Sequence, residues 1–141
     1  ISRGLNPDFI NKQGLAASLR QLAERASART GIRVHLVMNP DFCLQDPSFA
    51  VIIFRIMREC LTNAIRHGKA TRIVIGLTSS PSRVEISFVD NGVGMNAESA
   101  TKASFGFESM KHYAAIMNGS FTLESSAEKG TEILLTIPNN V

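Results

Sequence analysis

Four residues near the middle of the chain have the types and spacing of a phosphate or metal site. Glu59, Asn63 and His67 recur at intervals of four, which on a helix places them along one face, and Arg66 lies on its flank. The amide oxygen of Asn63 can bind Mg²⁺, which prefers oxygen ligands and shares its coordination with phosphates. The Glu59 carboxylate can orient or deprotonate a nucleophile, and the two cations can contact phosphate oxygens. A solvated polar helix face gives the same spacing, so both interpretations stay open.

A second group follows an apolar strand pattern and reads Asp90-Asn91-Gly92-Val93-Gly94-Met95. The two glycines permit backbone angles and close approaches that other residues resist, and the aspartate can accept a hydrogen bond from an amine. The segment lacks the third glycine of a dinucleotide-binding fingerprint and the lysine of a P-loop. Taken alone, it also fits a plain tight turn.

Two shorter segments complete the set. Gly106-Phe107-Glu108-Ser109-Met110 opens a predicted helix, whose N-terminus offers free backbone N–H groups to an anion. The alternative is a helix start with Phe107 and Met110 packed in the core. Gly130-Thr131 begins the last predicted strand and would by itself be only a turn.

Helices and strands must position these groups. Apolar spacing predicts helices over 7–30, 47–67 and 106–117, and alternation predicts strands over 32–38, 73–77, 84–88, 121–123 and 133–137. Because hairpins are separated by helices, we expect an α+β fold: a two-layer α/β sandwich with a mixed, mostly antiparallel sheet covered on one face by helices. One-for-one alternation of strands and helices is absent, which disfavours a doubly wound domain.

The composition indicates one globular domain. The chain has 141 residues, of which 44% are hydrophobic and 19% charged, and no apolar run approaches the roughly 20 residues of a membrane span. Its two cysteines are too few for a disulfide framework, so we expect two packed, reduced thiols. Residues 1–72 carry eleven basic and five acidic side chains, but no aromatic residues are interleaved with them, which disfavours nucleic-acid binding.

Taken in order, the four segments resemble the ATP-binding domain of the GHKL superfamily, which includes sensor histidine kinases, type II topoisomerase subunits, Hsp90 chaperones and MutL repair proteins. Residues 59–67 are similar to its N box, 90–94 to its G1 box, 106–110 to its G2 box, and Gly130-Thr131 to its terminal motif. The resemblance covers essentially the whole chain and implies the Bergerat ATP-binding fold, with residues 1–5 as the end of a preceding dimerisation helix.

Within this superfamily, the sequence is most similar to the histidine kinases typified by nitrate/nitrite and membrane-fluidity sensors. The box Glu59-x-x-x-Asn63-x-x-Arg66-His67-x-x-Ala70 begins with Glu, as in that subfamily, whereas other histidine kinases usually begin it with His. The opening Leu5-Asn6-Pro7 is also similar to the subfamily's entry.

The resemblance implies a role for each matched position. Adenine would be recognised by Asp90 with support from Thr131, Asn63 would bind Mg²⁺, and Glu59 would be catalytic. The implied ATP-binding residues are Asn63, Arg66, His67, Asp90, Gly92, Gly94, Met95, Gly106, Phe107, Met110 and Thr131. The implied cofactors are ATP and Mg²⁺.

The implied activity is transfer of the γ-phosphoryl group to a histidine on a separate dimerisation domain, in a cytoplasmic two-component sensor that acts on a response regulator. None of the three histidines here has the setting of an acceptor, so we expect no autophosphorylation by this chain alone. We expect neither nucleic acid nor direct membrane contact. Because Ser104 and Ser109 replace the outer glycines of the G2 box, a degenerate docking module is one alternative; an anti-sigma-type serine kinase is the other.

Overall fold

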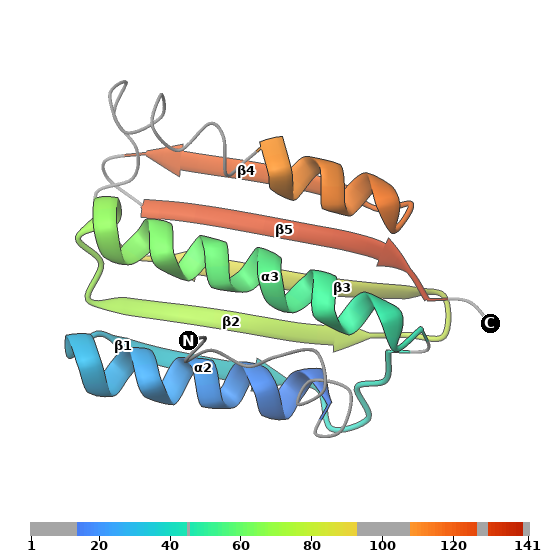
Figure 1. The fold of residues 1–141 in the computed structure, drawn as a ribbon, viewed down its shortest axis with the longest axis horizontal. Coiled ribbons are helices and arrows are strands. Elements are labelled where there is room, and N and C mark those ends of the chain that lie inside the picture. Colours follow the sequence, from blue (N-terminus) through green and yellow to red (C-terminus); the bar gives the residue numbers. More distant parts are fainter. Residues whose placement is uncertain (1–13, 45, 93–107, 127–129, 140–141) are drawn as a thin grey trace, which may run out of the picture.

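One five-stranded sheet forms the back of the molecule. The computed structural model describes residues 14–44, 46–92, 108–126 and 130–139. The strands lie in the order β1-β2-β3-β5-β4 (Figure 1). Their bounds are β1 Arg33–Met38, β2 Arg72–Ser79, β3 Arg83–Asp90, β4 Ser120–Ser126 and β5 Gly130–Pro138. The pair β1/β2 is parallel and the other three neighbours are antiparallel, which confirms the mixed, mostly antiparallel sheet.

Helices cover one face of this sheet. Helix α2 (Leu15–Thr30), helix α3 (Ser48–Asn63) and a helix over residues 108–116 all lie on the same side (Figure 1). Helix α3 connects β1 to β2, which a parallel pair requires because its second strand must start again at the first strand's beginning. The two-layer α+β sandwich is therefore confirmed.

Alternation along the strands decides which face is covered. Ile73, Ile75 and Leu77 of β2 are completely buried, as are the central apolar residues of β3 and β5, and all of them join one cluster with the helices. The residues between them, such as Thr78, Val89 and Glu132, face the open side of the sheet. Burying each such Leu or Ile side chain contributes about 1.5–3 kcal/mol. A shift of one residue would turn all of these side chains to the open face, so their burial fixes the register of the strands.

The helix boundaries follow from capping residues. The side chain of Asp46 accepts hydrogen bonds from the backbone N–H of Ser48 at 3.0 Å and from its hydroxyl at 2.6 Å, as the Asp-Pro helix start predicts. Gly31 ends α2 in the left-handed conformation, with φ of 80°. Asn118, with φ of 59°, and Gly119 end the helix over 108–116, which confirms the predicted stop.

The predicted helix over 47–67 is only partly α-helical. Helix α3 ends at Asn63 and continues as one π-helical turn, η1 (Ala64–Gly68), and Lys69 rather than Gly68 then adopts the left-handed conformation. Glu59 and Asn63 lie one turn apart on α3, as predicted. The side chain of His67 lies outside the described part of the chain, so its place on the same face stays a prediction.

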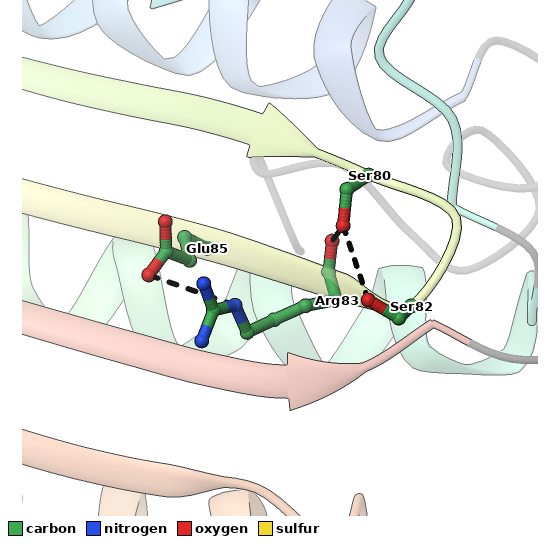
Figure 2. Close-up of polar contacts among 4 residues, drawn as sticks. All are labelled: Ser80, Ser82, Arg83 and Glu85. Carbon is green, nitrogen blue, oxygen red and sulfur yellow. Dashed lines mark hydrogen bonds and ion pairs between the residues drawn. The ribbon is translucent and has the colours of Figure 1, made fainter.

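The β2–β3 hairpin closes through a serine-rich turn, as predicted. Figure 2 shows the hydroxyl of Ser80 near that of Ser82, at 3.4 Å, and near the carbonyl of Arg83. The ion pair between Arg83 and Glu85 spans 4.0 Å and is exposed, so it contributes less than about 1 kcal/mol. Buried Asn139 ties this turn to the β1–α3 loop by donating to the carbonyls of Cys43 and Ser80.

Two expectations about composition can be compared with the fold. Cys60 is buried, but Cys43 is exposed, so the prediction of two packed thiols is wrong for Cys43, which lies in a surface loop. Within the described ranges, no helix combines the length and the apolar character needed to cross a membrane.

Candidate functional site

Asp90 lies where the sheet ends beneath the helices. It is the last residue of β3 and pairs with Ile73 of β2 on one side and Thr131 of β5 on the other. Only 3% of its surface is exposed, and its Oδ1 accepts a hydrogen bond of 2.8 Å from the backbone N–H of Gly92. The pairing of β3 with its two neighbours therefore holds a carboxylate at the end of the middle strand of the sheet.

The surroundings of this carboxylate oppose its charge. Burial raises the pKa of Asp90, and hydrogen bonds from the backbone N–H groups of Gly92 and Thr131 offset part of this rise. A carboxylate offers about four lone pairs, so these two donors leave room for a third. The site is suited to a neutral ligand group that donates a hydrogen bond, such as an amine.

Gly130 gives this region its close packing. Its φ is 86°, and a Cβ atom there would collide with the carbonyl oxygen of Asp90 and lie 2.9 Å from the nitrogen of Gly92. Both obstacles are backbone, so only glycine fits between the strand ends. Thr131 follows it, with its hydroxyl 3.1 Å from that of Ser125 on β4. The terminal Gly-Thr pair thus lies against the Asp90 segment.

The second half of the site is the end of α3. Glu59 and Asn63 lie one turn apart on this helix and are both half-buried. The Nδ2 atom of Asn63 is buried without a hydrogen bond to any described residue. Buried polar groups nearly always have a partner, so this amide fits a site completed by a ligand, and its oxygen suits Mg²⁺ shared with phosphates.

Cys60 directly follows Glu59 on α3 and is buried. Burial raises the pKa of its thiol, and the nearby charges of Glu59 and Asp90 raise it further, so both carboxylates lie within electrostatic range of one buried sulfur. Its Sγ is 3.7 Å from the Sδ of Met110, on the helix over 108–116. Met110 is 1% exposed, which matches the packing alternative for this residue and leaves it little surface for a ligand.

The predicted phosphate-contacting cations are only partly described. Arg66 lies in η1 and is exposed, and no ion pair joins it to another residue of the described ranges. A second arginine of α3, Arg58, lies with its guanidinium carbon 5.9 Å from the centre of the Phe54 ring, which is a cation–π contact. The side chain of His67 and all of Gly94, Met95, Gly106 and Phe107 lie outside the described part of the chain.

A hollow of about 470 Å³ opens beside Thr131 at the ends of β4 and β5. Its lining comprises Val89, Glu124, Ser125, Ser126, Gly130, Thr131 and Glu132. Glu124 and Glu132 are directly paired across the strands, so the hollow is acidic and repels anions. Among the described residues, this edge is therefore less suited to an anion than the end of α3 and η1, where Arg66 is exposed.

Reasoning from the sequence missed two residues of the site. Asn91 hydrogen-bonds with its side chain to the start of β2, and Ser125 contacts Thr131. The motif Asp-x-Gly-x-Gly drew attention to the carboxylate and the glycines and treated Asn91 as a spacer. Ser125 carried no sequence signal, because its role depends on the β4–β5 register.

The chain resembles a known family of ATPases and several known proteins. The family described as histidine kinase-, DNA gyrase B- and HSP90-like ATPases matches residues 50–141. The sensor histidine kinase LiaS of Bacillus subtilis (strain 168) is 28% identical over 138 residues, covering 95% of this chain and 37% of LiaS. The sensor histidine kinase ComP of the same organism is 27% identical over 128 residues, covering 89% of this chain and 17% of ComP.

The chain thus spans well under half the length of these two relatives. Among solved structures, the histidine kinase domain of a blue-light activated histidine kinase from Erythrobacter litoralis EL346 has a similar fold, with a TM-score of 0.68 and 21% identity. The match covers 89% of this chain and 61% of that one. Since the family match spans well over half of the chain and includes both halves of the site, this chain belongs to the histidine kinase-, DNA gyrase B- and HSP90-like ATPases.

Proposed function

We propose that this chain binds Mg-ATP and donates its γ-phosphoryl group to a histidine on a separate dimerisation domain of a two-component sensor kinase. The observation that carries the proposal is the buried carboxylate of Asp90 at the end of β3, on the same face of the strand as Phe88, which packs in one cluster with α3. Membership of the ATPase family supports ATP as the ligand, and the sensor histidine kinases among its relatives support histidine as the acceptor.

Base recognition falls to the strand ends. The Asp90 carboxylate, held by the N–H of Gly92, accepts a hydrogen bond from the exocyclic amine of adenine. Thr131 supports that contact through its hydroxyl, and Gly130 keeps the backbone close enough for the two to share one ligand. Four of the remaining family positions are proposed to line the nucleotide: Gly94, Met95, Gly106 and Phe107. Met110, which is buried against Cys60, would support this lining from the core rather than contact the ligand.

The triphosphate falls to the end of α3 and to η1. The amide oxygen of Asn63 is proposed to hold Mg²⁺, which supplies neutralisation of the charge on the phosphates. The guanidinium of Arg66 and the imidazole of His67 donate to phosphate oxygens. Arg66 is exposed and has no ion pair with any residue of the described ranges, so its guanidinium can meet such a ligand at little cost.

Glu59 is proposed to act on the incoming histidine. One ring nitrogen of that histidine forms a bond to the γ-phosphorus while the bond to the β–γ bridging oxygen breaks and ADP leaves. The Glu59 carboxylate accepts a hydrogen bond from the other ring nitrogen, which orients the imidazole and stabilises the positive charge that develops on it.

The wider setting is proposed from the relatives. We infer a cytoplasmic domain of a sensor similar to the nitrate/nitrite and membrane-fluidity group, acting with its own dimerisation domain and a response regulator. No contact with nucleic acid or with the membrane is part of this function. The exposed Glu108 and Ser109 in the altered G2 box leave the site at Asp90 and α3 intact.

The test is phosphorylation in trans. The chain is mixed with the dimerisation domain of its parent protein, supplied as a separate polypeptide, and with Mg-ATP labelled at the γ-phosphate. We expect label on the dimerisation domain that is lost in acid and kept in base, as a phosphohistidine requires. The variant Glu59→Gln should lower the transfer rate about 10²- to 10⁴-fold and leave ATP affinity within about threefold.

Other outcomes favour the alternatives. Acid-stable phosphoserine on a partner would indicate the anti-sigma type of kinase. ATP binding without any transfer, or no ATP binding up to millimolar concentration, would indicate a docking module. Equal losses of transfer and ATP affinity in Glu59→Gln would contradict a role for Glu59 in the chemical step.

A further inference from the structure

The side chain of Asn91 ties the end of β3 to the beginning of β2. Its Oδ1 accepts hydrogen bonds from the backbone N–H groups of Thr71, at 3.0 Å, and Arg72, at 2.9 Å. Its Nδ2 donates to the hydroxyl of Thr71 at 3.0 Å, and its backbone N–H donates to the carbonyl of Arg72 at 3.2 Å. Both ends of an exposed amide are thus held by one short segment.

This clasp lies next to Asp90 in two respects. Asn91 directly follows Asp90, and the N–H of the next residue, Gly92, holds the Asp90 carboxylate at 2.8 Å. Thr71 and Arg72 lie just after η1, so the clasp also joins the chain leaving the α3 helix to the chain leaving β3. The side chain of Asn91 therefore fixes the backbone of residues 90–92 through its bonds to Thr71 and Arg72, without contacting the Asp90 carboxylate.

We propose that Asn91 is a positioning residue that sets the base selectivity of this site by fixing the Gly92 N–H, and through it the direction of the Asp90 carboxylate. This inference rests on the proposed function, because it assumes that Asp90 meets the amine of adenine. In this role Asn91 acts through the backbone and not through contact with the nucleotide. A carboxylate that turns away from the amine loses the angle that a hydrogen bond needs, so selectivity falls before the fold does.

Inosine triphosphate reads out this direction. It differs from ATP at the position of the exocyclic amine, where it carries a carbonyl oxygen that cannot donate to a carboxylate. A site built to accept one specific hydrogen bond rejects such an analogue strongly. The ratio of the inosine triphosphate dissociation constant to that of ATP therefore measures how well the Asp90 carboxylate is oriented toward the amine. Partial unfolding weakens the binding of both nucleotides by the same factor and leaves this ratio unchanged.

Asn39 provides a matched control at the opposite end of the same strand. Its Oδ1 accepts a hydrogen bond from the backbone N–H of Ser79 at 3.1 Å, and its Nδ2 bonds to Asp41. It is thus a second asparagine that holds an end of β2, but at the end where Asp90 is absent. The variant Asn39→Ala should lower the thermal midpoint and keep the selectivity ratio of the wild type.

The experiment is calorimetric titration of the 141-residue chain and its variants with each nucleotide and Mg²⁺. We expect Asn91→Ala to lower the selectivity ratio at least about fivefold, and Asn91→Ser, whose hydroxyl reaches at most one of the two amides, to give an intermediate ratio. A wild-type ratio in folded Asn91→Ala or Asn91→Ser overturns the proposal, and so does an equal fall in Asn39→Ala. Absence of ATP binding by the wild type would instead refute the proposed function.

Discussion

Asp90 is the residue at which stability and function oppose each other. Its carboxylate is 3% exposed and is held by backbone N–H groups, and among the described residues no cation offsets the cost of its burial. Folding therefore favours its neutral form. A buried carboxylate of this kind lowers the stability of the free protein. It is useful when a ligand supplies a hydrogen-bond donor to it, and the amine of adenine is proposed to be that donor.

The pH dependence of stability follows from this. Because the pKa of Asp90 is raised in the folded state, its contribution to stability is fully present below the unfolded pKa and is lost as the pH rises through the folded pKa. The variant Asp90→Asn cannot ionise and keeps an oxygen that can accept from Gly92. We expect its thermal midpoint without nucleotide to exceed that of the wild type by a few degrees near pH 7.5, since about 1 kcal/mol corresponds to roughly 4 °C in a chain of this size.

The measurement is the thermal midpoint of both proteins between pH 3.5 and 8, with the difference taken at each pH. The two curves should converge at the acidic end, where wild-type Asp90 is protonated. A variant that is less stable than the wild type by the same amount at every pH would contradict a burial cost at Asp90.

The sequence singled out the chemical groups of the candidate site better than the residues that support them. Asp90, Asn63 and Gly130 belong to short motifs, so a few neighbouring positions suffice to single them out, and their roles stay predictions. Asn91 was missed because its bonds reach Thr71 and Arg72, some 20 residues away in sequence, and only the sheet register brings them together. Cys43 was misplaced because composition predicts burial of cysteine without knowing that its loop runs over the surface.

At the level of elements, every predicted helix and strand has a counterpart within the described ranges, but two helix boundaries differ from the prediction. The helix predicted over 7–30 begins only at Leu15, because Gly14 before it has a φ of 87° that no α-helix contains, and the helix predicted over 47–67 changes at the end of α3. The apolar periodicity of Phe49 to Ala64 predicts a helix but does not distinguish an α turn from a π turn, because the change is a single inserted residue per turn. The π turn spans Ala64–Gly68, directly after Asn63 and including Arg66, so it sets how these two candidate site residues are rotated relative to one another.

Gly119 connects the helix over 108–116 to β4, and its missing side chain allows that connection to pack. A Cβ atom there would lie 2.5 Å from both the carbonyl oxygen of Thr136 and a methyl group of Ile137. Because the first obstacle is backbone, Gly119→Ala should lower the free energy of unfolding by about 1–3 kcal/mol. Denaturant unfolding measures the change.

Gly76→Ala is the control for this substitution. A Cβ atom at Gly76 would meet only the hydroxyl of Ser87, at 2.5 Å, on the open face of the sheet, and that side chain can rotate away. We expect a change within about 0.5 kcal/mol. Equal losses in the two alanine variants would show that the close packing at Gly119 is not what matters.

At the scale of the whole molecule, a one-sided sheet accounts for both fold and site. The helices bury the face that carries Ile75, Ile86 and Leu135, and the site forms at the edge of this interface, where the strands end and α3 runs into η1. This layering could be predicted from the order of helices and hairpins. The position of the acidic hollow on the far side of Thr131 could not, because it depends on which strands become neighbours.

Calorimetric titration of Mg²⁺ and a non-hydrolysable ATP analogue into the wild-type chain and Asp90→Asn tests the central claim most directly. We predict a single site in the wild type and an affinity reduced at least about tenfold in the variant, because the base would lose a hydrogen bond to a charged acceptor worth roughly 1.5–3 kcal/mol. Equal affinities in the two proteins, or no binding by the wild type up to millimolar concentration, would contradict it.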